Sequence, residues 1–272
     1  MSRSRSRKDD IELAYADVIE RTVEDFGDHT GLTRPKIIRW LAQFPVVAQS
    51  TAAKALGEVR YHTSSNIRSM ARELAKIIYA DYKGTNLDHI FFVPIGGAGS
   101  GSQILARHLK AIGTIPKRQL IDLIDLTKLN SQNAEIVVFI DDFSGTGSAI
   151  KEWWEKIEPL ILPIGARNVA GILVLNCRAE RPLEQIFEKV LFVEFLDKAA
   201  NVLSVECNRF NQTEKEQLLA ACQSTGCAQN FIKGWGDCSL MLAFQHGCPN
   251  NTLPILWYQS NKWTALFRRR NV

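Results

Sequence analysis

The segment Val137-Val138-Phe139-Ile140-Asp141-Asp142-Phe143-Ser144-Gly145-Thr146-Gly147-Ser148 decides how the rest of the chain is interpreted. Its first residues predict a buried strand, which two carboxylates, a loop of small residues and the start of a helix follow. Gly145 and Gly147 allow a tight turn that directs several N–H groups at one point, and the loop hydroxyl groups add donors. The segment therefore predicts an anion cradle at the amino end of a helix. The residues of this cradle are Ser144, Gly145, Thr146, Gly147 and Ser148.

Two carboxylates stand directly before the cradle, where they would repel a bare phosphate. We therefore expect Asp141 and Asp142 to bind ribose hydroxyl groups attached to the phosphate, or a divalent cation beside it. The pattern predicts a site for a sugar phosphate. An Asp-Asp pair that precedes a glycine turn and binds no ligand is the structural alternative.

A second glycine-rich loop follows an earlier apolar run. Phe91–Ile95 predicts a strand that leads into Gly96-Gly97-Ala98-Gly99-Ser100-Gly101-Ser102 and then a helix. The loop does not read G-x-x-x-x-G-K-[ST], which excludes a Walker A motif. Glycine-rich turns of this kind are common, so the order of the two loops along the chain carries more weight than this loop alone.

Short apolar runs alternate with helical patterns from about residue 86 onward. We predict strands over His89–Ile95, Leu120–Leu126, Ile136–Ile140, Val169–Asn176 and Val190–Phe195. Helical patterns cover residues 103–111, 148–160, 183–189 and 213–224. This rhythm predicts an α/β fold with a doubly wound, mainly parallel sheet, in which ligands bind beyond the carboxyl ends of the strands.

The two ends of the chain differ from this core. Residues 1–10 are rich in Ser and Arg and predict a mobile basic tail, and residues 11–85 predict a small helical region. Within it, Gly31–Phe44 permits a helix-turn-helix, although a plain packing bundle is favoured. From about residue 226 the chain is rich in turn formers and aromatic residues, which predicts an irregular C-terminal cap over the core.

Composition excludes several classes of protein. The 272 residues are 46% hydrophobic and 23% charged, as in an ordinary globular chain, and no apolar run is long enough for a membrane helix. The six cysteines lack the spacing of a zinc site, so we interpret them as reduced thiols of a cytoplasmic protein, with metal binding as the alternative. Seven of the 33 positive charges lie in residues 3–8 and 268–270. These ends suit contact with phosphate in a nucleic acid or nucleoprotein, or they merely improve solubility.

The strand, the paired acids and the loop around Gly147 resemble the binding signature for 5-phosphoribosyl 1-pyrophosphate (PRPP) in type I phosphoribosyltransferases. The resemblance implies that Asp141 and Asp142 hold the 2′ and 3′ hydroxyl groups of PRPP, near a Mg²⁺ ion, and that residues 144–148 bind its 5-phosphate. It further implies a pyrophosphate-binding loop formed by Gly96, Gly97, Gly99 and Ser100. Residues 86–272 would then form a phosphoribosyltransferase-like domain that includes the cap.

This sequence departs from the family pattern at two places. The segment corresponding to the family's flexible loop, Thr127–Asn133, is short and offers only Lys128 as a ligand for the leaving pyrophosphate; a solvated turn residue is the alternative role. Gly145 stands where purine-salvage members place an acid that exchanges a proton with the purine. Purine salvage is therefore disfavoured, and His246 or Asp237 becomes the candidate for proton transfer. An ordinary turn histidine is the alternative for His246.

The stretch Pro249-Asn250-Asn251-Thr252-Leu253-Pro254 and the aromatic tail after it resemble the ending of phosphoribosyltransferase-like effectors of bacterial conflict systems. Members of that group occur beside anti-phage components such as retron reverse transcriptases. The resemblance implies an effector that acts with Mg²⁺ on PRPP or a related nucleotide, serves in anti-phage defence and is controlled by a nucleoprotein partner such as a reverse transcriptase–nucleic acid complex. An oligomer of the chain is a further candidate assembly. The alternative is a non-catalytic PRPP or nucleotide sensor that docks a nucleic-acid or protein partner.

Overall fold

The computed structural model describes residues 7–27, 31–97 and 100–269, and within it the chain forms two compact units. Of the described residues, those up to Thr63 and those from Lys198 onward form one unit, which we call the terminal unit. Ser64–Asp197 forms the other, which we call the sheet unit.

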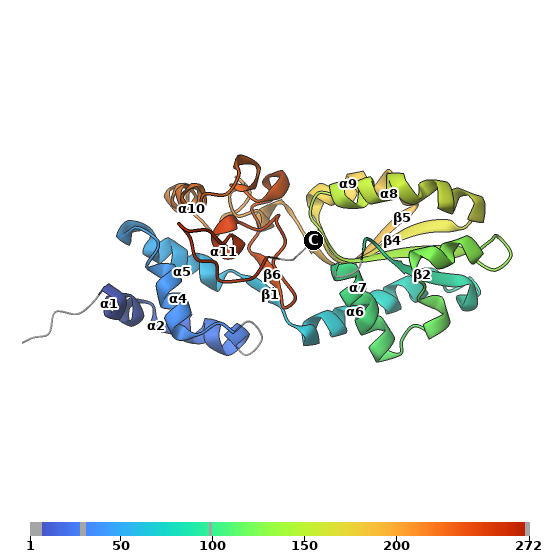
Figure 1. Ribbon diagram of the computed structural model, residues 1–272, viewed down its shortest axis with the longest axis horizontal. Coiled ribbons are helices and arrows are strands. Elements are labelled where there is room, and N and C mark those ends of the chain that lie inside the picture. The colour runs from blue at the N-terminus through green and yellow to red at the C-terminus, as the bar shows by residue number, and fades with distance from the viewer. Residues whose placement is uncertain (1–6, 28–30, 98–99, 270–272) are drawn as a thin grey trace, which may run out of the picture. The chain divides into compact units, whose positions relative to one another are not determined.

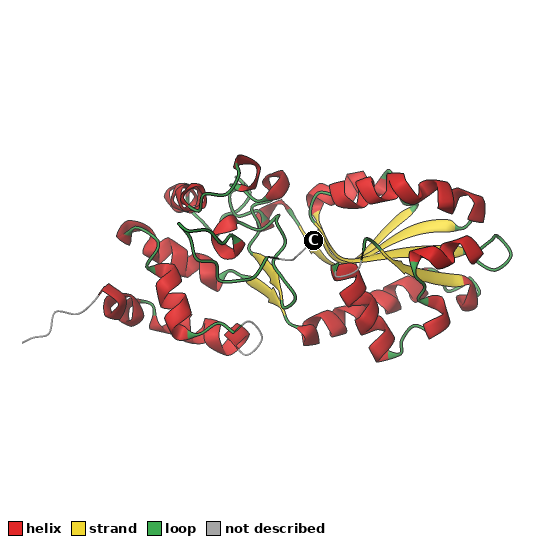
Figure 2. Ribbon diagram, in the orientation of Figure 1, coloured by secondary structure: helices red, strands yellow, loops and turns green. Residues whose placement is uncertain are grey.

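The sheet unit is a parallel sheet between two layers of helices (Figures 1 and 2). Its strands lie in the order β2, β3, β4, β5, and every neighbouring pair is parallel. The α/β class and the parallel sheet expected from the sequence are confirmed. The strands are β2 (Ile90–Pro94), β3 (Ile136–Ser144), β4 (Arg167–Asn176) and β5 (Lys189–Leu196). The main helices are α6 (Ser64–Asp81), α7 (Gly101–Ile112), α8 (Ser148–Ile161) and α9 (Cys177–Glu184).

Helices α8 and α9 cover one face of the sheet, and α6 and α7 cover the other (Figure 1). Val137 and Phe139 of β3 are fully buried in a core with apolar residues of α8 and α9. Gly171 of β4 lies beneath α6, because a Cβ built on it would stand 3.4 Å from Ile78 Cδ1 and 3.1 Å from a methyl group of Val138. Successive residues of β3 therefore face opposite sides of the sheet, one toward α8 and α9 and the next toward α6 and α7.

The sheet reverses its winding next to β2. One side of β2 pairs with β3, and on the other side Phe92 forms a parallel bridge with Leu120, with Ile121 N donating to Phe92 O at 3.0 Å. The chain thus leaves β2 through α7 in one direction and returns to β3 on the opposite side. In a doubly wound sheet the ligand site lies at such a reversal, beyond the carboxyl ends of the two strands. Here the reversal lies between β2 and β3.

The strand expected over Leu120–Leu126 is not formed beyond the bridge at Leu120. Residues Leu123–Lys128 form a 3₁₀ helix instead, and Ile124 is 78% exposed. An edge segment has only one neighbouring strand to pair with, and the two aspartates of this segment are poor strand formers, so ladder pairing stabilises it little.

The terminal unit is built from both ends of the chain. Trp40 Nε1 donates to Ile255 O at 2.8 Å, and the Phe44 and Trp263 rings meet edge to face at 5.1 Å. Strand β1 pairs in parallel with β6, although register partners such as Arg60 and Leu242 are 182 residues apart. The elements are α1 (Arg7–Ala14), α2 (Ala16–Thr22), α4 (Arg34–Leu41), α5 (Gln49–Gly57), β1 (Arg60–His62), α10 (Gln212–Ser224), β6 (Leu242–Phe244) and α11 (Pro254–Trp257).

Short helical turns complete both units. One π-helical turn, η1, is formed by Val23–Gly27. The 3₁₀ turns are η2 (Val46–Ala48), η3 (Leu87–His89), η4 (Lys117–Gln119), η5 (Leu123–Lys128), η6 (Leu162–Ile164), η7 (Lys198–Ala200), η8 (Gln229–Phe231) and η9 (Trp235–Asp237).

These units divide the chain differently from the boundaries expected near residues 10, 85 and 226. Residues 7–10, expected in a mobile tail, form the first turn of α1, and residues 1–6 lie outside the described part. Helix α6, expected in the N-terminal helical region, covers the sheet. The expected cap instead shares one hydrophobic core with α1, α2, α4 and α5. Contacts between distant segments set this division, and local patterns do not reveal them.

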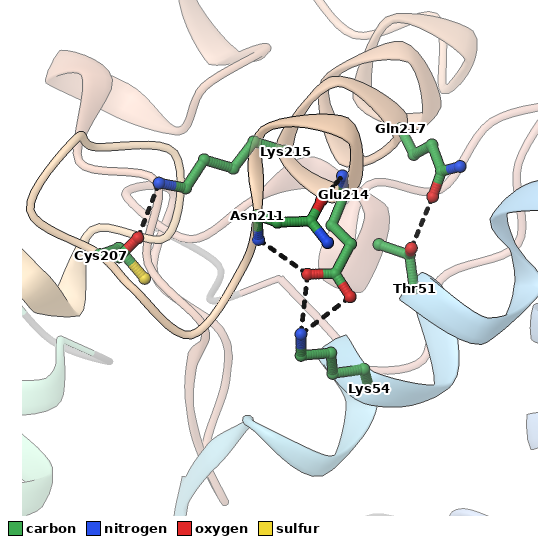
Figure 3. A network of polar contacts seen from close by, with 7 residues as sticks. All are labelled: Thr51, Lys54, Cys207, Asn211, Glu214, Lys215 and Gln217. Atoms are coloured by element: carbon green, nitrogen blue, oxygen red, sulfur yellow. Dashed lines mark hydrogen bonds and ion pairs between the residues drawn. The ribbon is translucent and has the colours of Figure 1, made fainter.

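A polar network joins α5 to α10 inside the terminal unit (Figure 3). Asn211 and Glu214 form a capping box at the start of α10, and Lys54 of α5 lies 2.7 Å from the Glu214 carboxylate. Thr51 Oγ1, one turn before Lys54 on α5, donates to Gln217 Oε1, one turn after Glu214 on α10, at 2.5 Å. The network fixes the register of one helix against the other.

No helix formed by the described residues combines the length and the apolar character needed to cross a membrane.

Candidate functional site

The site begins where β3 extends beyond β2. The last register pair between these strands is Pro94 with Ile140, and Ile95 N still donates to Ile140 O at 3.0 Å. Beyond this point β3 continues against β4 alone, from Asp141 opposite Ile172 to Ser144 opposite Leu175. The last four residues of β3 therefore stand at the winding reversal, beside the loop that follows β2.

Asp141 and Asp142 occupy the first two positions of this extension but differ in exposure. Asp141 is partly buried and its Oδ1 accepts a hydrogen bond of 2.9 Å from the Asp142 backbone N–H, whereas Asp142 is 0% exposed. Because side chains alternate along a strand, Asp141 continues the α8/α9 face of β3 and Asp142 continues the α6/α7 face. The two carboxylates therefore continue opposite faces of β3, and of the two only Asp141 is accessible from outside the protein.

The loop between β3 and α8 turns at Gly147. This residue has φ +77°, and a Cβ built on it would meet Pro182 Cβ at 3.1 Å and Ala179 O at 3.5 Å. Both the left-handed backbone and the close approach of α9 therefore require glycine here. Thr146 Oγ1 and Ser148 Oγ are joined by a hydrogen bond of 2.9 Å, so the two hydroxyl groups lie side by side.

The amino end of α8 opens directly after this turn. Gly147 occupies the N-cap position and has no side chain to cap the helix, while its carbonyl accepts from Lys151 N at 2.9 Å. The first-turn N–H groups and the helix dipole therefore favour an anion at this end. Ser144 and Gly145 are buried, Thr146 is partly buried and Ser148 is exposed. The five predicted cradle residues thus run from the last residue of β3 through the turn at Gly147 to the first residue of α8.

The loop after β2 is held to its strand by two serines. Ser102 is fully buried and its hydroxyl donates to Ile95 O, and Ser100 Oγ lies 2.6 Å from Ser102 Oγ. Gly96 has φ +86°, and Gly97 is exposed. Gly99 lies outside the described residues. Ser102 is a structural anchor that was not among the predicted site residues, and it follows the glycine run directly.

Asn176 was also not predicted as a site residue. It ends β4 next to the end of β3, is fully buried, and its Oδ1 accepts from Arg178 N at 3.1 Å to cap α9. Helix α9 in turn packs on Gly147, so this cap supports the loop of the cradle. The available signal was an asparagine between a predicted strand and a helix, which is typical of an N-cap.

The remaining predicted residues are not brought into this part of the sheet unit. Lys128 lies at the end of η5, is 77% exposed and forms an ion pair of 2.6 Å with Asp125. His246 and Asp237 belong to the terminal unit. His246 stacks on Phe244 with ring centroids 5.3 Å apart, and Asp237 adopts φ +53° in η9. Their proposed roles stay predictions.

A magnesium site was expected at the paired aspartates. Among the described residues, no group of three or more His, Cys, Asp or Glu side chains is placed to hold a metal ion. Mg²⁺ commonly uses one or two protein carboxylates together with substrate phosphates and water. Asp141 and Asp142 fit that mode of binding, in which the substrate supplies the remaining ligands, and do not fit a metal cage made by the protein alone.

Residues 37–269 match the model of the PRTase-CE family. The match covers most of both units, and the chain belongs to this family. No curated protein matches the chain.

Solved structures that match part of this chain include two phosphoribosyltransferases. A HGPRT-ase from Leishmania tarentolae in complex with GMP is 16% identical, with a TM-score of 0.33, over 52% of this chain and 84% of that one. A xanthine-guanine-hypoxanthine phosphoribosyltransferase from Helicobacter pylori is 8% identical, with a TM-score of 0.33, over 51% and 91%. The AQ2163 protein from Aquifex aeolicus is 15% identical, with a TM-score of 0.34, over 56% and 85%. Because all three TM-scores are low, we conclude nothing further from these matches.

Proposed function

We propose that this member of the PRTase-CE family binds PRPP, or a related nucleotide, across the end of β3 and replaces the group at C1 of its ribose. The observation that carries the proposal is the extension of β3 beyond β2, which places two carboxylates, the partly exposed Asp141 and the buried Asp142, directly before a phosphate-type loop at the amino end of α8. Carboxylates suit ribose hydroxyl groups as hydrogen-bond acceptors, and the loop suits the 5-phosphate.

In the proposed reaction, a nucleophile forms a bond to C1 while the bond from C1 to the pyrophosphate oxygen breaks. The pyrophosphate leaves with the electron pair of that bond. If the nucleophile is water, its proton passes to the solvent or to a base. Asp141 and Asp142 hold the ribose, residues 144–148 hold the 5-phosphate, and the loop from Gly96 to Ser100 receives the pyrophosphate. Fixing both ends of the substrate aligns C1 with the nucleophile, which lowers the entropic part of the barrier.

Mg²⁺ bound with the substrate would neutralise charge that develops on the leaving pyrophosphate. Of the protein residues, Asp141 and Asp142 are the ones that we propose to hold it.

A non-catalytic PRPP or nucleotide sensor is the second candidate function. It is favoured by Lys128, the only cation of the expected flexible loop, because this side chain is paired with Asp125 and points to solvent. A site without a cation for the leaving pyrophosphate stabilises the transition state less, so it favours binding of the ligand without turnover.

We further propose that the protein is an effector in anti-phage defence and that a nucleoprotein partner controls it. The resemblance of the C-terminal stretch to conflict-system effectors motivates this proposal. Expression of the chain alone should be toxic to bacteria, and co-expression with the partner should suppress the toxicity. Equal toxicity in both states would contradict partner control.

The proposed reaction is tested with the double variant Asp141→Asn/Asp142→Asn. With PRPP, Mg²⁺ and a panel of bases and nucleotides, the wild-type protein should release pyrophosphate, and the double variant should lose this activity by at least about a hundredfold, as expected when key polar contacts are removed. Glu152→Gln/Glu155→Gln removes two exposed charges from α8 and should leave turnover unchanged. Saturable PRPP binding without turnover would favour the sensor, and full activity of the double variant would overturn the site.

A further inference from the structure

Segments from both ends of the chain are hydrogen-bonded to α4 or to the turn that follows it. Lys36 of α4 donates from Nζ to Leu266 O at 2.8 Å, which fixes the C-terminal segment against α4. Arg7 of α1 donates from Nη2 to Phe44 O at 3.0 Å, just beyond the end of the same helix. Residues 7 and 266 are far apart in the sequence, so only the fold brings the two basic ends together.

Two further cations, Arg39 and Arg268, lie within electrostatic range of Lys36. Burial lowers the pKa of Lys36, and the nearby positive charges of Arg268 and Arg39 lower it further. Arg39 stands one turn after Lys36 on α4, and Arg39 and Arg268 are both exposed. Like charges held together in a folded protein repel, so the cluster is stabilised when an anion occupies it.

Two carboxylates of the neighbouring helices α1 and α2 pair with a cation outside this cluster. Glu12 and Glu20 both pair with Arg34, at 3.1 and 2.5 Å. Within the described part of the chain, Arg39 and Arg268 form no ion pair with a carboxylate. We call Lys36, Arg39 and Arg268 the α4 basic cluster.

We propose that the α4 basic cluster binds the phosphate backbone of a nucleic acid. We choose a polymeric ligand because the positive charges are several and are spread over more than one segment. Arg7 and Lys8 begin α1, and Arg269 follows Arg268 with its guanidinium 5.1 Å from the centre of the Trp257 ring, so further positive charges belong to the segments at both ends of the described chain. Such an array exceeds what one phosphate group can contact and matches a polymer with a phosphate at every residue. Guanidinium groups also contact phosphate oxygens in a bidentate manner.

This inference identifies nucleic acid as the part of the proposed nucleoprotein partner that the chain contacts. Only the biological role of that contact rests on the proposed function. The binding surface belongs to the terminal unit, whereas the sugar-phosphate site belongs to the sheet unit. Binding of nucleic acid and turnover of PRPP are therefore measured separately on the same full-length preparation.

The test is the salt dependence of binding to fluorescein-labelled single-stranded DNA and RNA, measured by fluorescence anisotropy. Wild-type protein should bind both, and log K should fall linearly with log salt concentration. The variant Arg39→Gln/Arg268→Gln should reduce the steepness of this line by about 1.4, because each lost phosphate contact on a single strand removes about 0.7. Its affinity at low salt should fall roughly tenfold or more.

Two further variants separate charge from structure. Lys110→Gln/Lys156→Gln removes two exposed charges from the sheet unit and should leave affinity and slope unchanged. Arg39→Lys/Arg268→Lys keeps the charges and should retain the wild-type slope, which a general loss of structure in the cluster would not allow.

The inference is overturned if the wild-type protein binds neither DNA nor RNA, if Arg39→Gln/Arg268→Gln keeps the wild-type slope, or if the protein binds phosphatidylserine vesicles in preference to the oligonucleotide. Failure of the proposed reaction would show differently, as nucleic-acid binding without release of pyrophosphate from PRPP.

Discussion

At the scale of single residues, the two aspartates have separate environments although they are neighbours in the sequence. Asp142 is fully buried, and Asp141 is partly exposed and accepts a backbone hydrogen bond. A buried carboxylate keeps a fixed orientation, whereas an accessible one can exchange water for a ligand hydroxyl. Asp141 is therefore the residue whose loss should affect ligand binding most directly, and replacement of Asp142 should also reduce stability.

Gly147 provides a test of the loop at the same scale. Gly147→Ala should lower the free energy of unfolding by about 1–3 kcal/mol, because alanine disfavours the positive φ and its Cβ would press on Pro182. The measurement is chemical denaturation monitored by circular dichroism.

Gly113→Ala is the matched control for this variant. Gly113 also has a positive φ, of +66°, but nothing lies within 4 Å of a Cβ built there. This variant should therefore cost only the backbone penalty of about 1 kcal/mol. Equal losses for the two variants would contradict a tight packing of α9 on the cradle.

The strand, the glycine turn and the helix start that carry the candidate site residues were predictable, because they follow one another in the sequence. The roles of these residues in binding a ligand stay predictions. The difference between Asp141 and Asp142 was not predictable, since it depends on how far β3 extends past β2. The pairing of Lys128 with Asp125 was not predictable either, because it requires the 3₁₀ turn that replaces the expected strand.

At the scale of elements, the contact between α5 and α10 is electrostatic as well as apolar. The hydrogen bond from Lys54 lowers the pKa of Glu214 below its usual value of 4.5. A carboxyl group with a lowered pKa stabilises the folded state fully above its unfolded pKa, and this stabilisation disappears as the pH falls through the folded pKa. The pair should therefore contribute at neutral pH and lose its contribution below about pH 4.5.

Lys54→Met tests this contribution. At pH 7 the free energy of unfolding of the variant should be lower than that of the wild type by up to about 1 kcal/mol. The loss is small because the pair is partly exposed. Below the pKa of Glu214 the two proteins should approach equal stability. Lys76→Met, which removes a more exposed pair with Glu73, serves as control and should show a smaller effect. A difference for Lys54→Met that is independent of pH would contradict the role of charge.

The elements of the sheet were predictable where strands are buried on both sides, since continuous apolar runs mark β2, β3 and β4. The segment after Leu120 was predicted wrongly, because its apolar residues pack as a 3₁₀ turn at the edge. Periodicity over such a short run does not separate the two conformations.

At the scale of the whole molecule, the division into units follows contacts between the chain ends. The core of the terminal unit requires Trp40 and Phe44 from one end and Ile255 and Trp263 from the other. Nothing in the local sequence of either end specifies its distant partner, which is why the expected boundaries did not coincide with the observed units. The basic cluster on α4 follows from the same closure of the chain ends.

The central claim is that one sugar phosphate binds across the end of β3. Isothermal titration of PRPP with Mg²⁺ into the full-length protein tests it most directly, because binding is measured whether or not turnover follows. We expect saturable binding to the wild-type protein and to Glu152→Gln/Glu155→Gln, and binding at least roughly tenfold weaker to Asp141→Asn, as the loss of one charged hydrogen bond implies. Unchanged affinity of Asp141→Asn, or no binding to the wild-type protein, would contradict the account.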